Sequence, residues 1–466
     1  MIEWVSHRLG DISKWSSGGT PSKSKPEYWD GDLPWISARS MDSNRYDSSH
    51  LCITELGLKN GSRLAKKGSI LLLVRGSILH QKIQVGIATK DVAFNQDVKA
   101  INVDESIIEP WYLLLWFMSK KADLLGLVEN TGIGAGKLDT ATLQDLIIDV
   151  PAPEERKRIL LFGRALDDKI ELNRQINETL EAMAQALFKS WFVDFDPVID
   201  NALAAGNPIP DVFAERAKQR AAKKPENQST SATAVNDSSN YQHLFPAEFE
   251  FTEEVGWIPL GWEVSQISGF GKVVTGKTPP KNIEDAYSDT GVPFITPTDV
   301  DDSVFVFSTN RFLSVQGQES VKKSKLPSGS ICVTCIGSQM GKTSIAPFES
   351  FSNQQINAIV GCDEVWRNYL FFNLRGRKEE IFLMGSGGST MPIVNKSTFE
   401  KLEVLRPTDN LVAVLGDSFK APVDTILSNT AENNILAKLR DTLLPKLLSG
   451  ELRIPDAEKL VQEALL

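Results

Sequence analysis

The stretch SGGTPSK at residues 17–23 decides the fold, because it returns as TGKTPPK at residues 275–281, 258 residues later. Three further pairs follow in the same order along the chain. They are 34–37 with 293–296, Asn95-Gln96 with Asn353-Gln354, and 143–151 with 399–407. The separation drifts only from 256 to 259 residues. An ordered series of this kind indicates two copies of one domain that differ by small loop insertions.

Each copy mixes the two kinds of secondary structure. The apolar, β-rich runs at 69–75 and 330–336 are bounded by Gly and Ser and predict strands. The runs at 111–125 and 368–374 predict helices. Strands do not alternate with long helices, so a doubly wound parallel sheet is not indicated. The fold class is therefore α+β, with two similar domains of mixed β-sheet plus helices.

A long amphipathic stretch follows each copy. Its apolar positions are spaced by threes and fours, as in the seam of a coiled coil. The first seam contains Ile159, Phe162, Leu166, Ile170, Asn173, Asn177, Leu180, Ala184, Leu187 and Trp191; the second contains Leu415, Phe419, Val423, Ile426, Asn429, Asn433, Leu436, Arg440, Leu443 and Leu447.

Two asparagines occupy matching positions in both seams, Asn173 and Asn177 in the first and Asn429 and Asn433 in the second. A seam asparagine costs stability but fixes register, because a slipped pairing buries an unsatisfied amide. We therefore expect the two helices to pair with each other; two ordinary core helices are the alternative. Pro422 is expected to delay the start of the second helix to about Val423.

Composition bounds the remaining possibilities. The 466 residues are 41% hydrophobic, and the longest apolar run, 111–118, is far shorter than the ~20 residues of a membrane helix. Four cysteines make a disulfide scaffold improbable and a reducing cytoplasm the expected location. The net charge of −10 is concentrated outside the repeats: residues 225–260 carry six acids and no Lys or Arg, whereas residues 1–150 are nearly neutral.

No motif for catalysis is complete. The loop Gly337–Thr343 follows a predicted strand but has one residue too few between its glycines for a phosphate-binding loop. Cys332 and Cys335 form a single CxxC pair, expected to be buried on opposite faces of a strand, and no metal site is indicated. The four histidines show no triad or metal spacing. We expect a protein without chemistry of its own.

Three longer motifs carry a resemblance to a known family. They are ALFKSWFVDFDP at 186–197, GWIPLGWE at 256–263 and LLPKLLSGEL at 443–452. With the Gly-x-Thr-Pro loops and the Asn-Gln pairs, the chain resembles the specificity (S) subunits of Type I restriction–modification systems. The first copy lacks the Gly-Trp-x-Pro-x-Gly-Trp entry and keeps only Trp4 in register with Trp262.

The resemblance implies an organisation with six segments. They are a target-recognition domain at 1–152, a central coiled-coil helix at 153–196, a partly disordered linker at 197–256, a second target-recognition domain at 257–408, a C-terminal coiled-coil helix at 409–450 and an acidic tail at 451–466. The two helices would pair antiparallel, giving the molecule a pseudo-twofold axis.

The same resemblance implies the function. Each domain would read one half of a bipartite, asymmetric double-stranded DNA target, and the coiled coil would fix the unread spacer. Two modification subunits, carrying S-adenosylmethionine, would dock on it and methylate adenine N6. Up to two restriction subunits, using ATP and Mg²⁺, would add cleavage. This chain would bind no cofactor itself.

Base reading needs side chains that offer paired donors and acceptors, on exposed loops. The candidates are Thr20, Lys23, Arg39, Arg75, Ser77, Asn95, Gln96 and Lys137 in the first copy and Thr278, Lys281, Thr296, Thr298, Ser338, Gln339, Lys342, Thr343, Asn353 and Gln354 in the second. Because the Asn-Gln pair recurs in domains expected to read different sequences, a turn-building role for it stays open. Positions that differ between copies, such as Arg75 against Ile336, are better candidates for specificity.

Two other functions stay open. The repeats of a coiled-coil adaptor would bind protein and not DNA. A nucleotide-binding protein would use the loop Gly337–Thr343.

Overall fold

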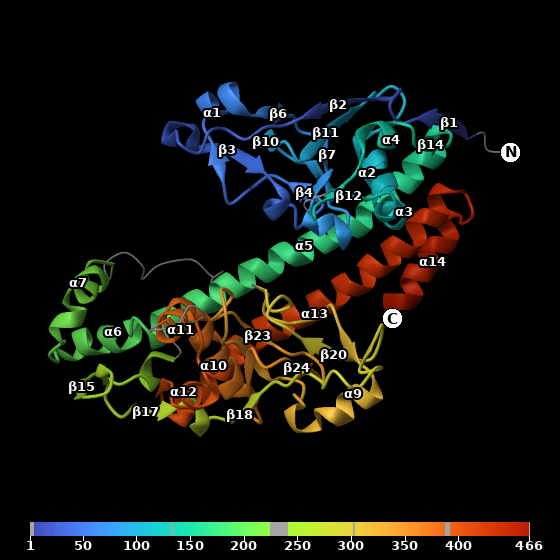
Figure 1. Cartoon of the computed structure of the whole chain (residues 1–466). Helices are drawn as coiled ribbons and strands as arrows, with labels where there is room; N and C mark the ends of the chain where they lie inside the picture. The colour runs from blue at the N-terminus through green and yellow to red at the C-terminus, as the bar shows by residue number, and fades with distance from the viewer. Residues whose placement is uncertain (1–3, 132–133, 224–240, 302, 387–391, 466) are drawn as a thin grey trace. The chain divides into compact units, whose positions relative to one another are not determined.

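The structure, a computed structural model, describes residues 4–131, 134–223, 241–301, 303–386 and 392–465 (Figure 1). Its chain divides into two compact units, one formed by 1–172 with 432–466 and the other by 173–431. The division does not follow the repeat boundaries, because each long helix, α5 (Pro153–Phe192) and α13 (Asp409–Leu448), is shared between the units.

The first unit contains the first repeat. Its largest sheet has the strand order β2-β11-β7-β9-β4, and a second sheet has the order β5-β3-β10-β6. The pair β1–β14 joins the start of the repeat to its end. The strands are β1 (Val5–Arg8), β2 (Ser13–Ser17), β3 (Trp29–Ile36), β4 (Arg45–Tyr46), β5 (Cys52–Ile53), β6 (Arg63–Ala65), β7 (Ile70–Leu73), β8 (Arg75–Gly76), β9 (Val85–Ala88), β10 (Val92–Phe94), β11 (Val98–Val103), β12 (Glu129–Asn130), β13 (Gly136–Lys137) and β14 (Ile147–Val150).

The second unit repeats this topology. Its sheet β18-β25-β22-β23 matches β2-β11-β7-β9, and the pair β17–β26 closes the repeat as β1–β14 does. The strands are β15 (Phe249–Thr252), β16 (Gly256–Pro259), β17 (Glu263–Gln266), β18 (Lys272–Thr275), β19 (Tyr287–Ser288), β20 (Val292–Ile295), β21 (Phe312–Leu313), β22 (Ile331–Thr334), β23 (Thr343–Ile345), β24 (Phe351–Ser352), β25 (Ile356–Val360) and β26 (Glu403–Arg406). The α+β class and the two-domain repeat are thereby confirmed.

The predicted strands and helices of the repeats are present. β7 and β22 lie inside the runs predicted as strands, and both are fully buried. The first helical run forms α2 (Pro110–Ser119) and α3 (Lys121–Gly126), and the second lies inside α10 (Glu364–Gly376). The shorter helices are α1 (Glu55–Gly61), α4 (Thr140–Gln144), α9 (Val315–Ser320), α11 (Lys378–Gly385) and α12 (Lys396–Glu400).

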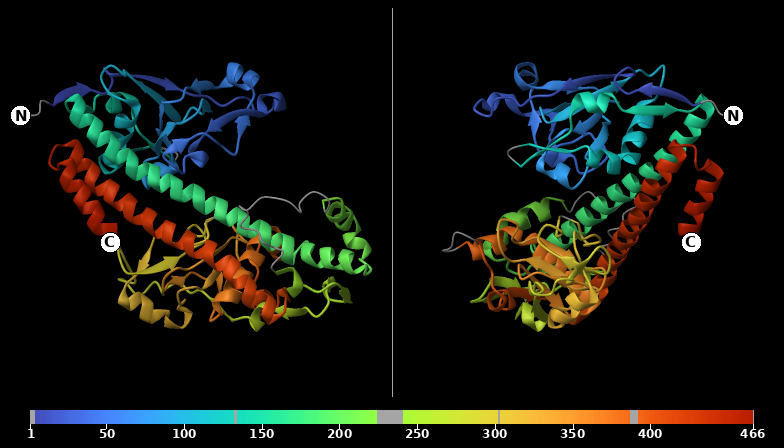
Figure 2. Two further views of the ribbon diagram at one scale, coloured as in Figure 1. Left: turned by 180° about the vertical axis from the view of Figure 1, so that it is seen from behind. Right: turned by 45° about the vertical axis from the view of Figure 1, so that its right-hand side comes forward.

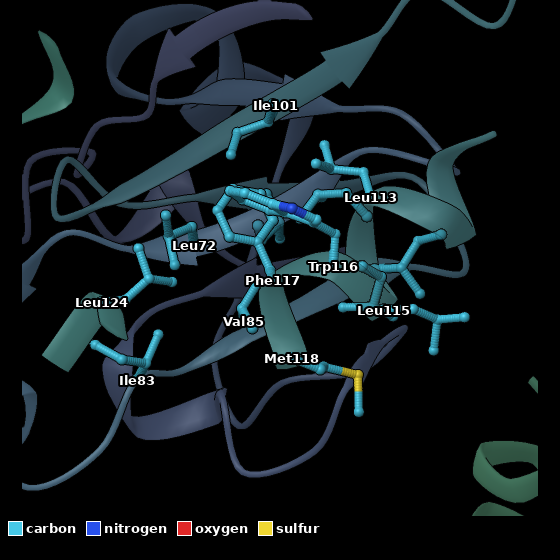
Figure 3. Close-up of a cluster of buried hydrophobic side chains, with 14 of the residues drawn as sticks. Leu72, Ile83, Val85, Ile101, Leu113, Leu115, Trp116, Phe117, Met118 and Leu124 are labelled. Carbon is cyan, nitrogen blue, oxygen red and sulfur yellow. The ribbon is translucent and has the colours of Figure 1, made fainter. Parts of the chain in front are cut away.

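The core of the first unit forms where α2 packs on the largest sheet. Trp116 and Phe117 of α2 lie against Leu72, Val85 and Ile101 of the sheet (Figure 3). All five are 5% exposed or less, so α2 is buried around most of its circumference and not on one stripe only. This explains why the sequence shows a continuous apolar run and not a helical period.

Within each unit, α5 and α13 run side by side and antiparallel (Figure 2). In the second unit, Asn429 Nδ2 donates to Asn177 Oδ1 at 2.9 Å, and Asn177 Nδ2 donates to Thr430 Oγ1 at 3.2 Å. In the first unit, Asn433 Nδ2 donates to the Ile170 carbonyl at 3.2 Å. The predicted helix pairing is confirmed, and the seam amides satisfy one another or the facing backbone, as a register-fixing role requires.

One expectation outside the repeats is wrong. α13 begins at Asp409 and passes through Pro422, because burial of Leu411, Val412 and Phe419 in the core of the second unit outweighs the lost hydrogen bond. The segment predicted as an acidic tail contains a helix, α14 (Ile454–Leu465), which buries Ala457 in the first unit's core.

The described part of the linker predicted at 197–256 forms regular secondary structure. It contains α6 (Asp196–Ala205), α7 (Ala214–Lys223) and the hairpin β15–β16. Arg216 and Arg220 of α7 pair with Asp196 and Asp200 of α6, which holds the two helices together. The segment 225–240, predicted to be the mobile part, lies outside the described residues.

Candidate nucleic-acid interface

The recurrent Gly-x-Thr-Pro loop contacts the recurrent Asn-Gln pair in both repeats. Thr20 Oγ1 donates to Gln96 Oε1 at 2.6 Å, and Thr278 Oγ1 donates to Gln354 Oε1 at 2.7 Å. The two motifs that revealed the repeat in the sequence are therefore partners in space, and each repeat contains the same contact.

Backbone packing explains the glycine in this loop. A Cβ atom built on Gly18 would lie 2.1 Å from the Phe94 carbonyl oxygen, and one on Gly276 would lie 2.1 Å from the Asn353 carbonyl oxygen. Real Cβ atoms do not approach backbone so closely, and only glycine permits the contact.

The asparagine of each pair builds the turn that the loop packs on. Asn95 Oδ1 accepts a hydrogen bond from the Asp97 backbone N–H at 3.1 Å, and Asn353 Oδ1 accepts one from the Gln355 N–H at 3.1 Å. These are Asx turns. Asn95 is buried, whereas Gln96 is exposed. The geometry favours the turn-building role for the pair over base reading.

Arg75 and Lys137 are brought together by the structure, although 62 residues separate them. They face each other across the β8–β13 ladder, and Ser77 follows β8 directly at the start of the 3-10 helix Ser77–His80. Arg75 and Ser77 are exposed and have no side-chain hydrogen bond or ion pair among the residues that the structure describes. They are available to a ligand.

Lys137 is less free than Arg75. Its Nζ lies 3.3 Å from Asp139 Oδ1 and 4.0 Å from Glu129 Oε2. Hydrogen bonds from the Thr142 backbone N–H and from Lys137 hold the pKa of Asp139 below its usual value. Asp139 is therefore ionised at neutral pH and partly neutralises Lys137, which leaves Arg75 as the stronger cation of the pair.

The same place in the second repeat is apolar. Ile336 forms a bridge with Ile393 where the first repeat has Arg75 opposite Lys137. Ile393 is 50% exposed, and the exposed Ser338 and Gln339 follow on the next turn. Ile393 was missed from sequence; its position 256 residues after Lys137, the separation of the 143–151 and 399–407 pair, was the signal that could have found it. The two repeats thus share a scaffold and differ at one exposed edge.

The loop Gly337–Thr343 is a tight turn between two antiparallel strands, closed by a hydrogen bond from the Gly341 N–H to the Thr334 carbonyl at 2.8 Å. A phosphate-binding loop needs a helix after it, and here β23 follows. The nucleotide-binding alternative is therefore wrong. Thr343 is 2% exposed, so its inclusion among the DNA-reading candidates is wrong as well, whereas Lys342 is half-buried on the turn.

The other candidates lie on separate loops. Lys23, Arg39 and Lys281 are exposed and have no polar side-chain partner among the described residues. Thr296 is engaged, since its Oγ1 donates to Asp299 Oδ2 at 2.6 Å and lies 2.9 Å from Thr298 Oγ1.

Cys332 and Cys335 are buried in two different apolar clusters, which confirms the opposite faces predicted for them. Burial raises the pKa of the Cys332 thiol to about 12 and that of Cys335 to about 11, so both stay protonated and unreactive. In the described parts of the chain, no three His, Cys, Asp or Glu side chains are placed to hold a metal ion. None of the described helices is long and apolar enough to cross a membrane.

Comparison with known proteins defines the class. Residues 1–182 and 259–410 match the family model of the Type I restriction modification DNA specificity domain. The chain is 31% identical to the Type I restriction enzyme HindI specificity subunit of Haemophilus influenzae over 97% of this chain and 100% of that protein. It is 26% identical to the MjaIX specificity subunit of Methanocaldococcus jannaschii over 97% and 94%. The solved S subunit from M. genitalium covers 96% of both chains at 13% identity with a TM-score of 0.48.

The family-model match and the 31% identical relative define a DNA-specificity protein of the Type I restriction–modification class. The chain belongs to the family of Type I specificity subunits, with two target-recognition domains, and is a non-catalytic component of its system.

We expect Gly18→Ala to destabilise the first repeat. The added Cβ must displace backbone at Phe94, which costs about 1–3 kcal/mol in the free energy of unfolding. Chemical denaturation of the full chain measures this. Gly126→Ala is the control, since a Cβ there meets nothing within 4 Å. Equal stabilities of the two variants would contradict the close approach.

Proposed function

We propose that each recognition domain reads one half of a bipartite, asymmetric DNA target, while the α5–α13 pair fixes the spacer and docks two modification subunits that methylate adenine N6. S-adenosylmethionine belongs to those subunits, and ATP and Mg²⁺ to restriction subunits where these are present. The chain acts in the cytoplasm and binds no cofactor itself.

One observation carries the proposal. The two repeats contain the same Thr–Gln contact and the same strand order. At one edge they differ: the first repeat has Arg75 opposite Lys137, and the second has Ile336 opposite Ile393. A shared scaffold with a divergent exposed edge is what two readers of different sequences need. Arg75 can donate two hydrogen bonds to guanine, whereas an apolar edge beside Gln339 suits thymine methyl groups and adenine.

A feature of α5 supports subunit docking. Leu161, Leu172 and Met183 are 57%, 52% and 46% exposed. Their spacing of 11 residues is close to three helical turns, so they follow one another along one side of α5. Exposed apolar stripes of this kind mark interaction surfaces.

The decisive experiment expresses the chain with its modification subunit in a methylation-free host and maps N6-methyladenine in the genome. We expect a single split motif with methylated adenines on both strands. Replacement of residues 1–150 by the corresponding domain of a relative should change one half of the motif only. A soluble complex without methylation would favour the adaptor alternative.

Arg75→Ala should relax the half-site of the first domain at one base position. Loss of a bidentate contact costs about 1–3 kcal/mol of discrimination, which the methylation map reports as additional methylated variants of that half. Gln339→Ala is the reciprocal variant and should affect the other half alone. If both variants altered the same half, the assignment of one domain to each half would be wrong.

Met183→Glu should weaken binding of the modification subunit at least tenfold, because a carboxylate would be buried in an apolar contact. Titration by analytical ultracentrifugation measures this. Val212→Glu is the matched control, since Val212 is 71% exposed and belongs to another element, the 3-10 helix Asp211–Phe213. Unchanged binding by Met183→Glu would remove the stripe from the interface.

A further inference from the structure

The first recognition domain contacts its helix pair through buried charges. Asp167 of α5 is 4% exposed. Arg45, from strand β4, donates to Asp167 Oδ2 through Nε at 3.0 Å and Nη2 at 2.8 Å. The Arg45 guanidinium also stacks on the Trp111 ring, 4.9 Å from its centroid, and donates to Asp168. Two charge-assisted hydrogen bonds from one guanidinium converge on one buried carboxylate oxygen, which leaves the other oxygen, Oδ1, for further donors.

Two further donors complete the site. Asn44 Nδ2 donates to Asp167 Oδ1 at 3.2 Å, and Arg440 Nη1 of α13 lies 3.4 Å from the same oxygen. Arg440 is 6% exposed and also donates through Nε to Asp441 at 2.9 Å. One carboxylate thus joins the domain, α5 and α13. We refer to Asn44, Arg45, Asp167 and Arg440 as the charged layer.

The repeat identifies the four equivalent positions in the second domain. The Ile87 N–H donates to the Asn44 carbonyl at 2.9 Å, and the Ile345 N–H donates to the Val304 carbonyl at 2.8 Å. Ile87 likewise pairs in parallel with Arg45 as Ile345 does with Phe305. Val304 and Phe305 therefore stand where Asn44 and Arg45 stand in the first domain.

The helix positions follow from the seam asparagines. Both helices are continuous, so the separation of 256 residues between Asn173 and Asn429 holds along them. Asp167 then corresponds to Val423, and Ala184 corresponds to Arg440.

All four equivalents are apolar and buried in one cluster of the second unit. Val304, Phe305, Val423 and Ala184 are 2%, 6%, 1% and 4% exposed. The same layer of the fold is therefore charged in one unit and apolar in the other. A domain carrying Arg45 on a helix pair carrying Val423 would lose its buried carboxylate partner and keep only Asp424, at the position of the exposed Asp168. The reverse combination would leave the buried Asp167 with Arg440 as its one remaining partner in the charged layer.

We propose that the charged layer and its apolar counterpart confine each recognition domain to its own helix pair, and so determine which domains the scaffold accepts at each position. The inference rests on the proposed function, since acceptance is read out as methylation of the half-site that a domain carries. These are positioning residues, which act without touching DNA.

A stability cycle tests the layer directly. Asp167→Val removes the buried carboxylate that Arg45 and Arg440 share, and leaves them only the exposed Asp168 and Asp441. It should lower the melting temperature of the full chain on the order of 10 °C. The quadruple variant Asn44→Val, Arg45→Phe, Asp167→Val, Arg440→Ala reproduces the apolar layer and should recover most of that loss. Asp123→Val, at an exposed carboxylate paired with Lys120, is the control for loss of an ion pair. A quadruple variant no more stable than Asp167→Val would overturn the interchangeability of the two layers.

A graft tests the functional consequence. Residues 257–408 are replaced by a second copy of residues 1–152, and the chain is expressed with the modification subunit. Two identical readers should methylate a palindrome of the first half-site. The unmatched graft places its copy of Arg45 against Val423 and Ala184 and should methylate at least tenfold less than a graft whose second copy carries Asn44→Val and Arg45→Phe.

Expression of the unmodified parent chain in the same host distinguishes failure of the proposed function from failure of the positional role of the charged layer. Without methylation by the parent, the proposed function fails. With an active parent, equal methylation by the two grafts overturns the positional role, and so does an inactive matched graft that still binds the modification subunit.

Discussion

The antiparallel contact between α5 and α13 is the constraint on which the rest of the structure depends. In each unit, a stretch of α5 and a stretch of α13 supply the surface on which the sheets and α2 or α10 pack. The core of the first domain accordingly includes one residue of α5, Ile159, and three of α13, Leu443, Leu444 and Leu447. The seam amides fix the register of that contact. Every side chain that a recognition domain places on the helices, Arg45 included, depends on this register.

The elements that could be predicted from the sequence are those whose signal is local or repeated. The duplicated SGGTPSK stretch, the seam spacing of α5 and the apolar runs of β7 and α2 each report a property that a few neighbouring residues determine. The repeat then predicts that both domains share one topology. A motif found twice at one separation identifies equivalent residues in the two domains before any contact between residues is known.

Features that tertiary contacts determine could not be predicted from local sequence. Asp167 looks like an exposed helix residue beside the seam, because its partner Arg45 is 122 residues away. Pro422 is a helix breaker by local rule, yet the burial of its neighbours carries α13 through it. Thr343 stands in a loop-like motif but belongs to a buried strand. The candidate edge at Arg75 was found because the copies differ there, and its pairing with Lys137 required the fold.

Because residues 432–466 belong to the first unit, that unit cannot complete its core until the end of the chain has been synthesised. The ribosome completes residues 1–172 before it has made the last turns of α13 and α14, which close the core around Leu443, Leu444 and Ala457. At about 5–20 residues per second, the roughly 260 residues between these segments take on the order of 10–50 s to synthesise. For that interval, the first domain exposes the apolar surface that the end of α13 and α14 cover in the complete chain.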